Sequence, residues 1–288
     1  MVTIGGNTIV VDILPSEHRG EGLGYYGLTN NLALCIAPMF GLLAHNCYSY
    51  EIIFSIGFLT CLVGFILASI VRAPAKKPKT EQRIPLSLDR FFLLKSIPAS
   101  LSLILLSIPY GAVTNFVAIY ITDLHISMTP GYFFVLMAIG MGCSRIFSGK
   151  YVDKGYITEC IQYGLYVIIT SFLLLGSCHW LTPYGTRLVQ IILIIVPLLH
   201  GIGFGILFPA FNTLYINLGR HNQRATAISS YLTSWDIGIG LGMIISGTIA
   251  QISHFGYVYI LGGFLAIVST VYFIIKVTPH YKRNKIDD

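Results

Sequence analysis

Two ionisable side chains, Asp236 and His200, lie deep inside long apolar runs of this 288-residue chain. Asp236 follows Arg224 by twelve residues, which is about 18 Å along an α-helix and reaches the middle of a bilayer. Burial favours the neutral form of a carboxyl group, so Asp236 could bind and release protons and couple a proton gradient to solute movement. A structural carboxylate that accepts hydrogen bonds between helices is the alternative.

His200 lies within the Gly- and Pro-rich stretch 197–205, which Pro209 follows. Interrupted helices of this kind expose backbone groups to a cavity, so His200 could contact a substrate or carry a proton. A histidine that is hydrogen-bonded between two helices is the alternative. Asn115 and Asn212 are further candidates for substrate contact, because an amide at membrane depth needs a substrate or a neighbouring helix as its partner.

Long apolar windows must position these residues. Mean hydropathy is +0.74, and 55% hydrophobic against 10% charged residues leaves too few charges to coat a soluble protein of this length. Each window is long enough to cross about 30 Å of hydrocarbon as a helix. The windows lie near 22–45, 50–71, 96–122, 131–149, 157–178, 187–216, 225–251 and 255–277. The sequence therefore predicts an all-α polytopic membrane helix bundle, with eight full transmembrane helices surrounded by the lipid bilayer.

The basic residues are distributed asymmetrically among the gaps between these windows. Seventeen of the 18 Lys and Arg residues fall in alternate gaps, and Arg187 is the exception. Basic residues near membrane-spanning ends stay in the cytoplasm, so we expect residues 72–95 and the C-terminus on the cytoplasmic side of the inner membrane. Topology and an anionic leaflet account for the net charge of +6, and nucleic-acid binding is not expected.

Motifs of metal sites and of intramembrane enzymes are not found in the sequence. The six cysteines include no closely spaced metal-ligand pair, and no cofactor is expected. H-E-x-x-H and a G-x-S-x-G elbow are absent, and no apolar window contains a clustered Asp pair. An intramembrane lipid transferase or protease is therefore a minor alternative.

A shift of 205 residues reveals an internal repeat, because it aligns the start of the chain with the window 225–251. Arg19 then falls on Arg224, and Asn31 falls on Asp236. Asn31 has no ionisable group, and we count it among the candidate substrate contacts. Two homologous halves are implied, as in transporters that are built from repeats.

An arrangement of six plus six helices, of which this chain would contain the fifth to the twelfth, together with a basic central loop and this repeat length, resembles the major facilitator superfamily. Residues 149–155, Gly-Lys-Tyr-Val-Asp-Lys-Gly, look like the family's G-x-x-x-D-[RK]-x-G signature between the eighth and ninth helices, with one residue missing before Gly155. The resemblance implies a cytoplasmic gate that faces the start of the fifth helix. Its residues would be Arg145, Gly149, Asp153, Lys154 and Gly155, together with Arg19 and Arg224 at the starts of the fifth and eleventh helices.

Residues 37–41, Ala-Pro-Met-Phe-Gly, are similar to a G-P-x-x-G element on the family's fifth helix that is associated with exporters and antiporters. Pro38 would bend this helix, and Gly41 would permit close packing of the two halves. The resemblance also places His200 on the tenth helix and Asn115 on the seventh, which line the family's central cavity.

We therefore expect a secondary transporter of a small organic solute that works by alternating access, as an exporter coupled to protons or another ion. The domains expected are 1–71, the remainder of an N-terminal half; 72–95, a cytoplasmic linker; 96–277, a C-terminal six-helix half; and 278–288, a cytoplasmic tail. Because residues 1–14 align with the end of the window 187–216, we expect the chain to start inside a helix and to lack part of its N-terminal half. An inactive or regulatory fragment and a naturally short N-terminus are the alternatives.

Overall fold

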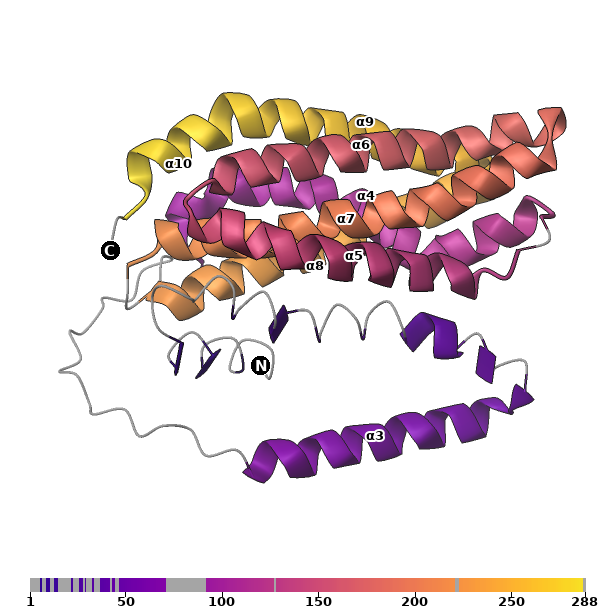
Figure 1. Cartoon of the computed structure of the whole chain (residues 1–288), viewed down its shortest axis with the longest axis horizontal. Helices are drawn as coiled ribbons and strands as arrows, with labels where there is room; N and C mark the ends of the chain where they lie inside the picture. The colour runs from indigo at the N-terminus through magenta and orange to yellow at the C-terminus, as the bar shows by residue number, and fades with distance from the viewer. Residues whose placement is uncertain are drawn as a thin grey trace.

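Long helices that run side by side make up the computed structural model of the chain (Figure 1). The structure describes residues 47–70, 92–126, 128–220 and 223–286, with scattered positions from Gly6 to Ala44. These residues form helices and no strand, and seven of the helices are long and apolar enough to cross a membrane. The predicted all-α membrane bundle is therefore confirmed, while half of the positions in the window 22–45 lie outside the described residues.

Six of the spanning helices, α4 to α9, pack into one bundle, whereas α3 stands apart from it and has no buried residue (Figure 1). The bounds are α3 Tyr50–Ile70, α4 Ile97–Asp123, α5 Gly131–Asp153, α6 Ile157–Leu181, α7 Thr186–Leu218, α8 Arg224–Ile252 and α9 Phe255–Tyr272. Short turns extend three of them: η3 Leu94–Ser96, η4 Thr182–Tyr184 and the π-helical η6 Phe273–Val277, which leads into α10 Thr278–Asn284.

Several of these helices continue beyond the apolar windows that predicted them, among them α6, which ends at Leu181 rather than near 178. Helix α5 ends at Asp153 rather than near 149, and α7 ends at Leu218 rather than near 216. The hydropathy of a window falls where polar side chains begin, but a helical backbone satisfies its own hydrogen bonds there as well as in lipid. Helix length is therefore set by the loops, and hydropathy marks only the part inside the hydrocarbon.

Glycines bring the backbones of α5 and α7 into direct contact. A Cβ atom added at Gly201 of α7 would collide with the Met137 carbonyl oxygen of α5, and one added at Gly140 of α5 would collide with the Leu198 carbonyl oxygen of α7. A Cβ atom at Gly205 would likewise overlap Ser144 Oγ. Small residues allow this approach, and in lipid the resulting van der Waals contact is a main source of helix association.

Glycines also bring the backbones of α4 and α8 into close contact. A Cβ atom at Gly242 would collide with the Ile108 carbonyl oxygen, and one at Gly238 would overlap the side chain of Ser107. In the other direction, a Cβ atom at Gly111 would lie 2.6 Å from the Ile239 carbonyl oxygen. The small-x-x-x-small face at 238 and 242 therefore packs against α4.

One end of the bundle collects the loop 154–156, the end of α7 with Gly219 and Arg220, the start of α4 and the C-terminal α10 (Figure 1). His280 Nε2 lies 2.8 Å from the Lys95 carbonyl oxygen, and Asn217 Nδ2 donates to Tyr281 Oη at 3.0 Å. The opposite end carries the loops that join α4 to α5, α6 to α7 and α8 to α9. Among the described Lys and Arg residues of the bundle, only Arg187 lies at that opposite end.

We predict that Gly201→Ala lowers the stability of the bundle by about 1–3 kcal/mol, because the added methyl group would push α5 and α7 apart. Gly142→Ala is the matched control, since no described atom lies within 4 Å of a Cβ atom at this helical position. There we expect no loss, or a gain of up to about 1 kcal/mol from helix propensity. Thermal unfolding in detergent measures both; equal effects of the two variants would contradict the close contact.

Candidate functional site

Asp236 lies on a side of α8 that does not pack on the described bundle. Gly238 faces α4, and Asp236 precedes it by two residues, which is about 200° around a helix. Its side chain is exposed, whereas the neighbouring Trp235 is buried. Only 22% of the apolar window of α8 is buried, against 44–59% in the other five helices of the bundle. The carboxyl group is therefore available to a ligand or to a further surface at membrane depth.

Four aromatic residues from three helices meet beside Asp236, and we call them the aromatic cluster: Tyr110 of α4, Phe204 and Phe208 of α7, and Trp235 of α8. The ring centroid of Tyr110 is 4.6 Å from that of Phe204 and 4.8 Å from that of Trp235. The rings of Phe208 and Trp235 are also 4.8 Å apart, at an interplanar angle of 78°. Such edge-to-face pairs fix ring orientation as well as burying area, so the cluster makes a rigid wall.

His200 lies in the core between α5, α6 and α7, and it is fully buried. Its Nδ1 atom hydrogen-bonds to Ser171 Oγ of α6, and its ring packs against Phe172 with centroids 4.5 Å apart. Because Ser171 Oγ donates to the Val196 carbonyl oxygen at 3.2 Å, it accepts from Nδ1–H, which leaves Nε2 unprotonated. Among the described residues Nε2 has no hydrogen-bond partner. This environment fits the alternative for His200, a histidine that is hydrogen-bonded between two helices.

The two amides lie one turn from the aromatic cluster. Asn115 is exposed on α4, and its Nδ2 donates to the Gly111 carbonyl oxygen at 2.8 Å. Asn212 of α7 is half-buried, and its Oδ1 is enclosed without a hydrogen-bond partner in the described part of the chain. Asn115 follows Tyr110 by five residues and Asn212 follows Phe208 by four. Both amides are thus close along the chain to residues of the aromatic cluster, whereas Asn31 lies outside the described residues.

The aromatic cluster was not predicted from the sequence. One signal was available. Phe204 and Phe208 are four residues apart on a Gly- and Pro-rich helix, so they share one face, and Trp235 directly precedes the membrane-depth acid. The serine that bonds His200 gave no signal, because Ser171 lies in an ordinary apolar run.

The end of α5 explains the missing residue in the loop motif. Tyr156 N donates to the Tyr151 carbonyl oxygen at 3.2 Å and Gly155 N to that of Val152 at 3.0 Å, which is the Schellman pattern of a helix C-terminus. Gly155 has a φ of +89°, a conformation that this pattern requires and that other residues rarely adopt. Asp153 and Lys154 are exposed just before it.

Arg145 connects α5 with the segment that precedes α3. It is 8% exposed, and a Cβ atom at Gly27 would lie 2.8 Å from its Nη1 atom. Further along α5, a Cβ atom at Gly131 would be 3.6 Å from Met39 Cγ. These contacts place the described positions near 27 and 39 along α5, although Arg19 itself lies outside the described residues.

The other motif residues are placed as follows. Gly149 is buried, and Arg224 is half-buried at the start of α8. Pro38 and Gly41 are helical, and no described atom lies within 4 Å of a Cβ atom at Gly41. Close packing at Gly41 stays a prediction.

Comparison with known proteins places this polytopic helix bundle in the class of membrane transporters rather than enzymes. The family model of the Major Facilitator Superfamily matches residues 1–242 and 155–287. The chain belongs to this superfamily and is a multi-pass membrane protein.

Relatives of the chain are also transporters. Staphylopine export protein of Staphylococcus aureus (strain Mu50 / ATCC 700699) is 25% identical over 281 residues, which are 94% of this chain and 69% of that protein. Uncharacterized MFS-type transporters of Burkholderia mallei (strain SAVP1) and Burkholderia pseudomallei (strain 668) are each 22% identical over 242 residues. That match covers 84% of this chain, which spans 55% of the length of those two relatives.

We predict that Gly155→Ala destabilises the loop between α5 and α6 by about 1–2 kcal/mol, because alanine is disfavoured at positive φ. Gly155→Asn should lose less, since asparagine tolerates this conformation better. Hydrogen exchange of the 154–156 amides, followed by mass spectrometry, measures the local effect. Equal protection in both variants and in the unmodified chain would contradict the requirement for glycine.

Proposed function

We propose that this chain carries out proton-coupled export of a small organic solute by alternating access. The observation that carries the proposal is Asp236, an acid at membrane depth that is exposed on the unpacked side of α8 next to the aromatic cluster. A carboxylate there can take up a proton as the site opens to one side and release it to the other. The name of the staphylococcal relative, an export protein, supports the direction.

Substrate would bind against the wall formed by the aromatic cluster. Asn115 and Asn212 lie within about one turn of it and offer amide donors and acceptors. His200 is fully enclosed by ring and helix contacts, so we assign it a positioning role: it holds α6 against α7 behind Phe204. Staphylopine is the first substrate to assay, because the relative's name states that it exports this compound.

The unpacked side of α8 needs an opposing surface if a cavity is to open and close. We propose that an N-terminal half supplies it, with residues 1–71 as its final part, 72–95 as the linker, 96–277 as the second half and 278–288 as the tail. The contacts of Arg145 with Gly27 and of Gly131 with Met39 support such a face-to-face arrangement along α5. Rocking of two such halves would alternate access to the site.

The orientation follows from the basic residues, which gather at the α10 end of the bundle with Arg187 as the exception among those described. We propose that this end faces the cytoplasm from the inner membrane. The 149–155 loop motif would then be a cytoplasmic gate.

We predict that Asp236→Asn abolishes accumulation of staphylopine in inside-out vesicles driven by a pH gradient, because asparagine cannot carry a proton. Exchange of labelled for unlabelled staphylopine at equal pH should persist within about twofold, since substrate binding needs no net proton transfer. Asp123→Asn, an exposed acid at the end of α4, is the control and should leave both fluxes unchanged. Gradient-driven accumulation that survives in Asp236→Asn would rule out its coupling role.

A second prediction concerns the gate. Asp153→Asn should weaken the state that is closed to the cytoplasm, because a neutral side chain forms weaker hydrogen bonds to arginine or to a helix N-terminus. A cysteine introduced at Ala225, which is exposed at the cytoplasmic start of α8, should then react several times faster with a membrane-impermeant maleimide. The native cysteines are replaced beforehand, and Asp153→Glu is the control that keeps the charge. An unchanged labelling rate would count against the gate.

A further inference from the structure

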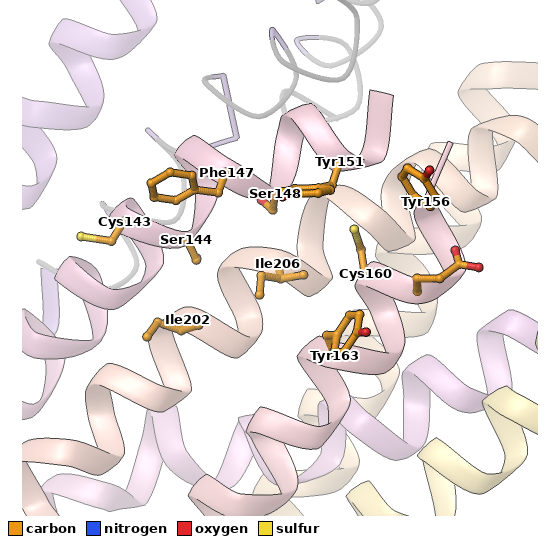
Figure 2. A pocket seen from close by; sticks show the side chains of 11 residues that line it. Cys143, Ser144, Phe147, Ser148, Tyr151, Tyr156, Cys160, Tyr163, Ile202 and Ile206 are labelled. Atoms are coloured by element: carbon orange, nitrogen blue, oxygen red, sulfur yellow. The ribbon is translucent and has the colours of Figure 1, made fainter. Parts of the chain in front are cut away.

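A groove of about 810 Å³ opens between α5 and α6, with α7 as its floor (Figure 2). Cys143 and Ile202 lie at one end of it, and Tyr151, Tyr156 and Cys160 lie at the other. None of its lining residues belongs to α4 or α8. The groove is therefore separate from Asp236 and from the aromatic cluster with Tyr110 and Trp235. A ligand could occupy it whether or not the chain transports a solute as proposed.

The groove runs from the 154–156 loop towards the middle of the bundle. Cys143 and Tyr151 are eight residues apart on α5, which is about 12 Å along the helix axis. One leaflet contributes about 15 Å of hydrocarbon. The volume is in the range of small-molecule pockets and too small for another transmembrane helix. Its length and volume therefore suit a single lipid chain that enters from the leaflet next to the loop.

Exposed aromatic side chains form the rim of the groove. Tyr151 and Tyr156 are about half exposed next to the loop, and Phe147 and Tyr163 project further along. Tyrosines at this depth are typical of the boundary between headgroups and acyl chains. The loop end of the groove is therefore the level at which a headgroup would lie.

Opposite charges flank that loop end. Lys154 Nζ lies 5.9 Å from the ring centroid of Tyr151, which lines the α5 wall. Glu159 lines the α6 wall, and its Oε2 accepts a hydrogen bond from Thr158 Oγ1 at 2.9 Å. A headgroup with a phosphate and an ammonium group matches this pair, with the phosphate at the lysine and the ammonium at the carboxylate. A purely anionic headgroup would leave Glu159 facing like charge.

A buried polar atom within the groove also lacks a partner. Ser148 is 5% exposed and lines the groove, and its Oγ has no hydrogen bond to any described residue. By contrast, the hydroxyl of Ser144, one turn away, donates to the Met141 carbonyl oxygen at 3.0 Å. An enclosed hydroxyl without a partner is costly, and a bound ligand's ester oxygen would satisfy it.

We propose that this groove binds one phospholipid with a phosphoethanolamine headgroup, which lies between Lys154 and Glu159 while one acyl chain follows the groove past Ser148 towards Ile202. The lipid would fill the space between α5 and α6 and hold the two walls at a fixed distance. It would thus brace the α5 end that carries the loop motif.

Native mass spectrometry of the purified protein in detergent tests the headgroup, with dioleoyl phosphatidylethanolamine, phosphatidylglycerol and phosphatidylcholine as probes. We expect one phosphatidylethanolamine to remain bound at a concentration about tenfold lower than the other two. Glu159→Gln should remove this preference, while Glu51→Gln, an exposed acid on α3, should keep it. Equal retention of the three lipids, or a preference that survives Glu159→Gln, would overturn the headgroup assignment.

The location is tested by the rate at which N-ethylmaleimide labels a variant whose only cysteine is Cys160. Phosphatidylethanolamine should slow this labelling at least fivefold, because the thiol lies in the wall beneath the proposed chain. A variant with only Cys61, which is exposed on α3, is the control and should be labelled at the same rate with and without the lipid. Labelling of Cys160 that ignores the lipid would overturn the site, whatever the headgroup preference.

Discussion

Direct backbone contact through glycine is the constraint on which the bundle depends. In lipid the apolar side chains gain nothing by leaving their surroundings, so helices associate where they can approach closely. Gly201 and Gly140 supply this approach between α5 and α7, and Gly238 and Gly242 supply it between α4 and α8. Each of the four would collide with its neighbouring helix if it carried a Cβ atom. The two pairs therefore have fixed lateral spacing, and the rest of the bundle is arranged around them.

The candidate transport site depends on this spacing. Helix α7 contributes Phe204 and Phe208 to the aromatic cluster, while Tyr110 and Trp235 come from the α4–α8 pair. The cluster thus joins one glycine-packed pair to the other at membrane depth. Asp236 follows Trp235 directly, so the ring that is fixed in the cluster also fixes the backbone that carries the acid. The carboxyl group that we propose for proton coupling is in this way mounted on a rigid support.

Sequence and structure agree on the features that a single helix determines by itself. The span positions follow from hydropathy. The depth of Asp236 in the bilayer, counted from Arg224, stays a prediction. The sequence could not say which face of each helix packs, because in a membrane helix the lipid-facing and protein-facing residues are both apolar. The aromatic cluster, the bond between Ser171 and His200, and the groove beside Ser148 all depend on that choice. Gly155 is an intermediate case. The loop motif in the sequence already includes this glycine, but only the backbone shows why glycine is needed there, at a helix end with positive φ.

The contacts of α9 and α10 with α4 have a mechanical consequence. Ser102 and Ser269 exchange hydrogen bonds between α4 and α9, with Ser269 Oγ donating to the Ser102 carbonyl oxygen at 2.8 Å, and His280 bonds to the backbone just before α4. The last helix of the bundle is thereby fastened to its first, and α4, α8, α7, α6 and α9 close into a ring, with α5 packed mainly against α7 outside it. A closed ring resists shear between its members, so a force applied through the linker at Leu93 would turn the ring, together with α5, as one lever. The pivot would then lie outside the ring, beyond α5 and the unpacked side of α8.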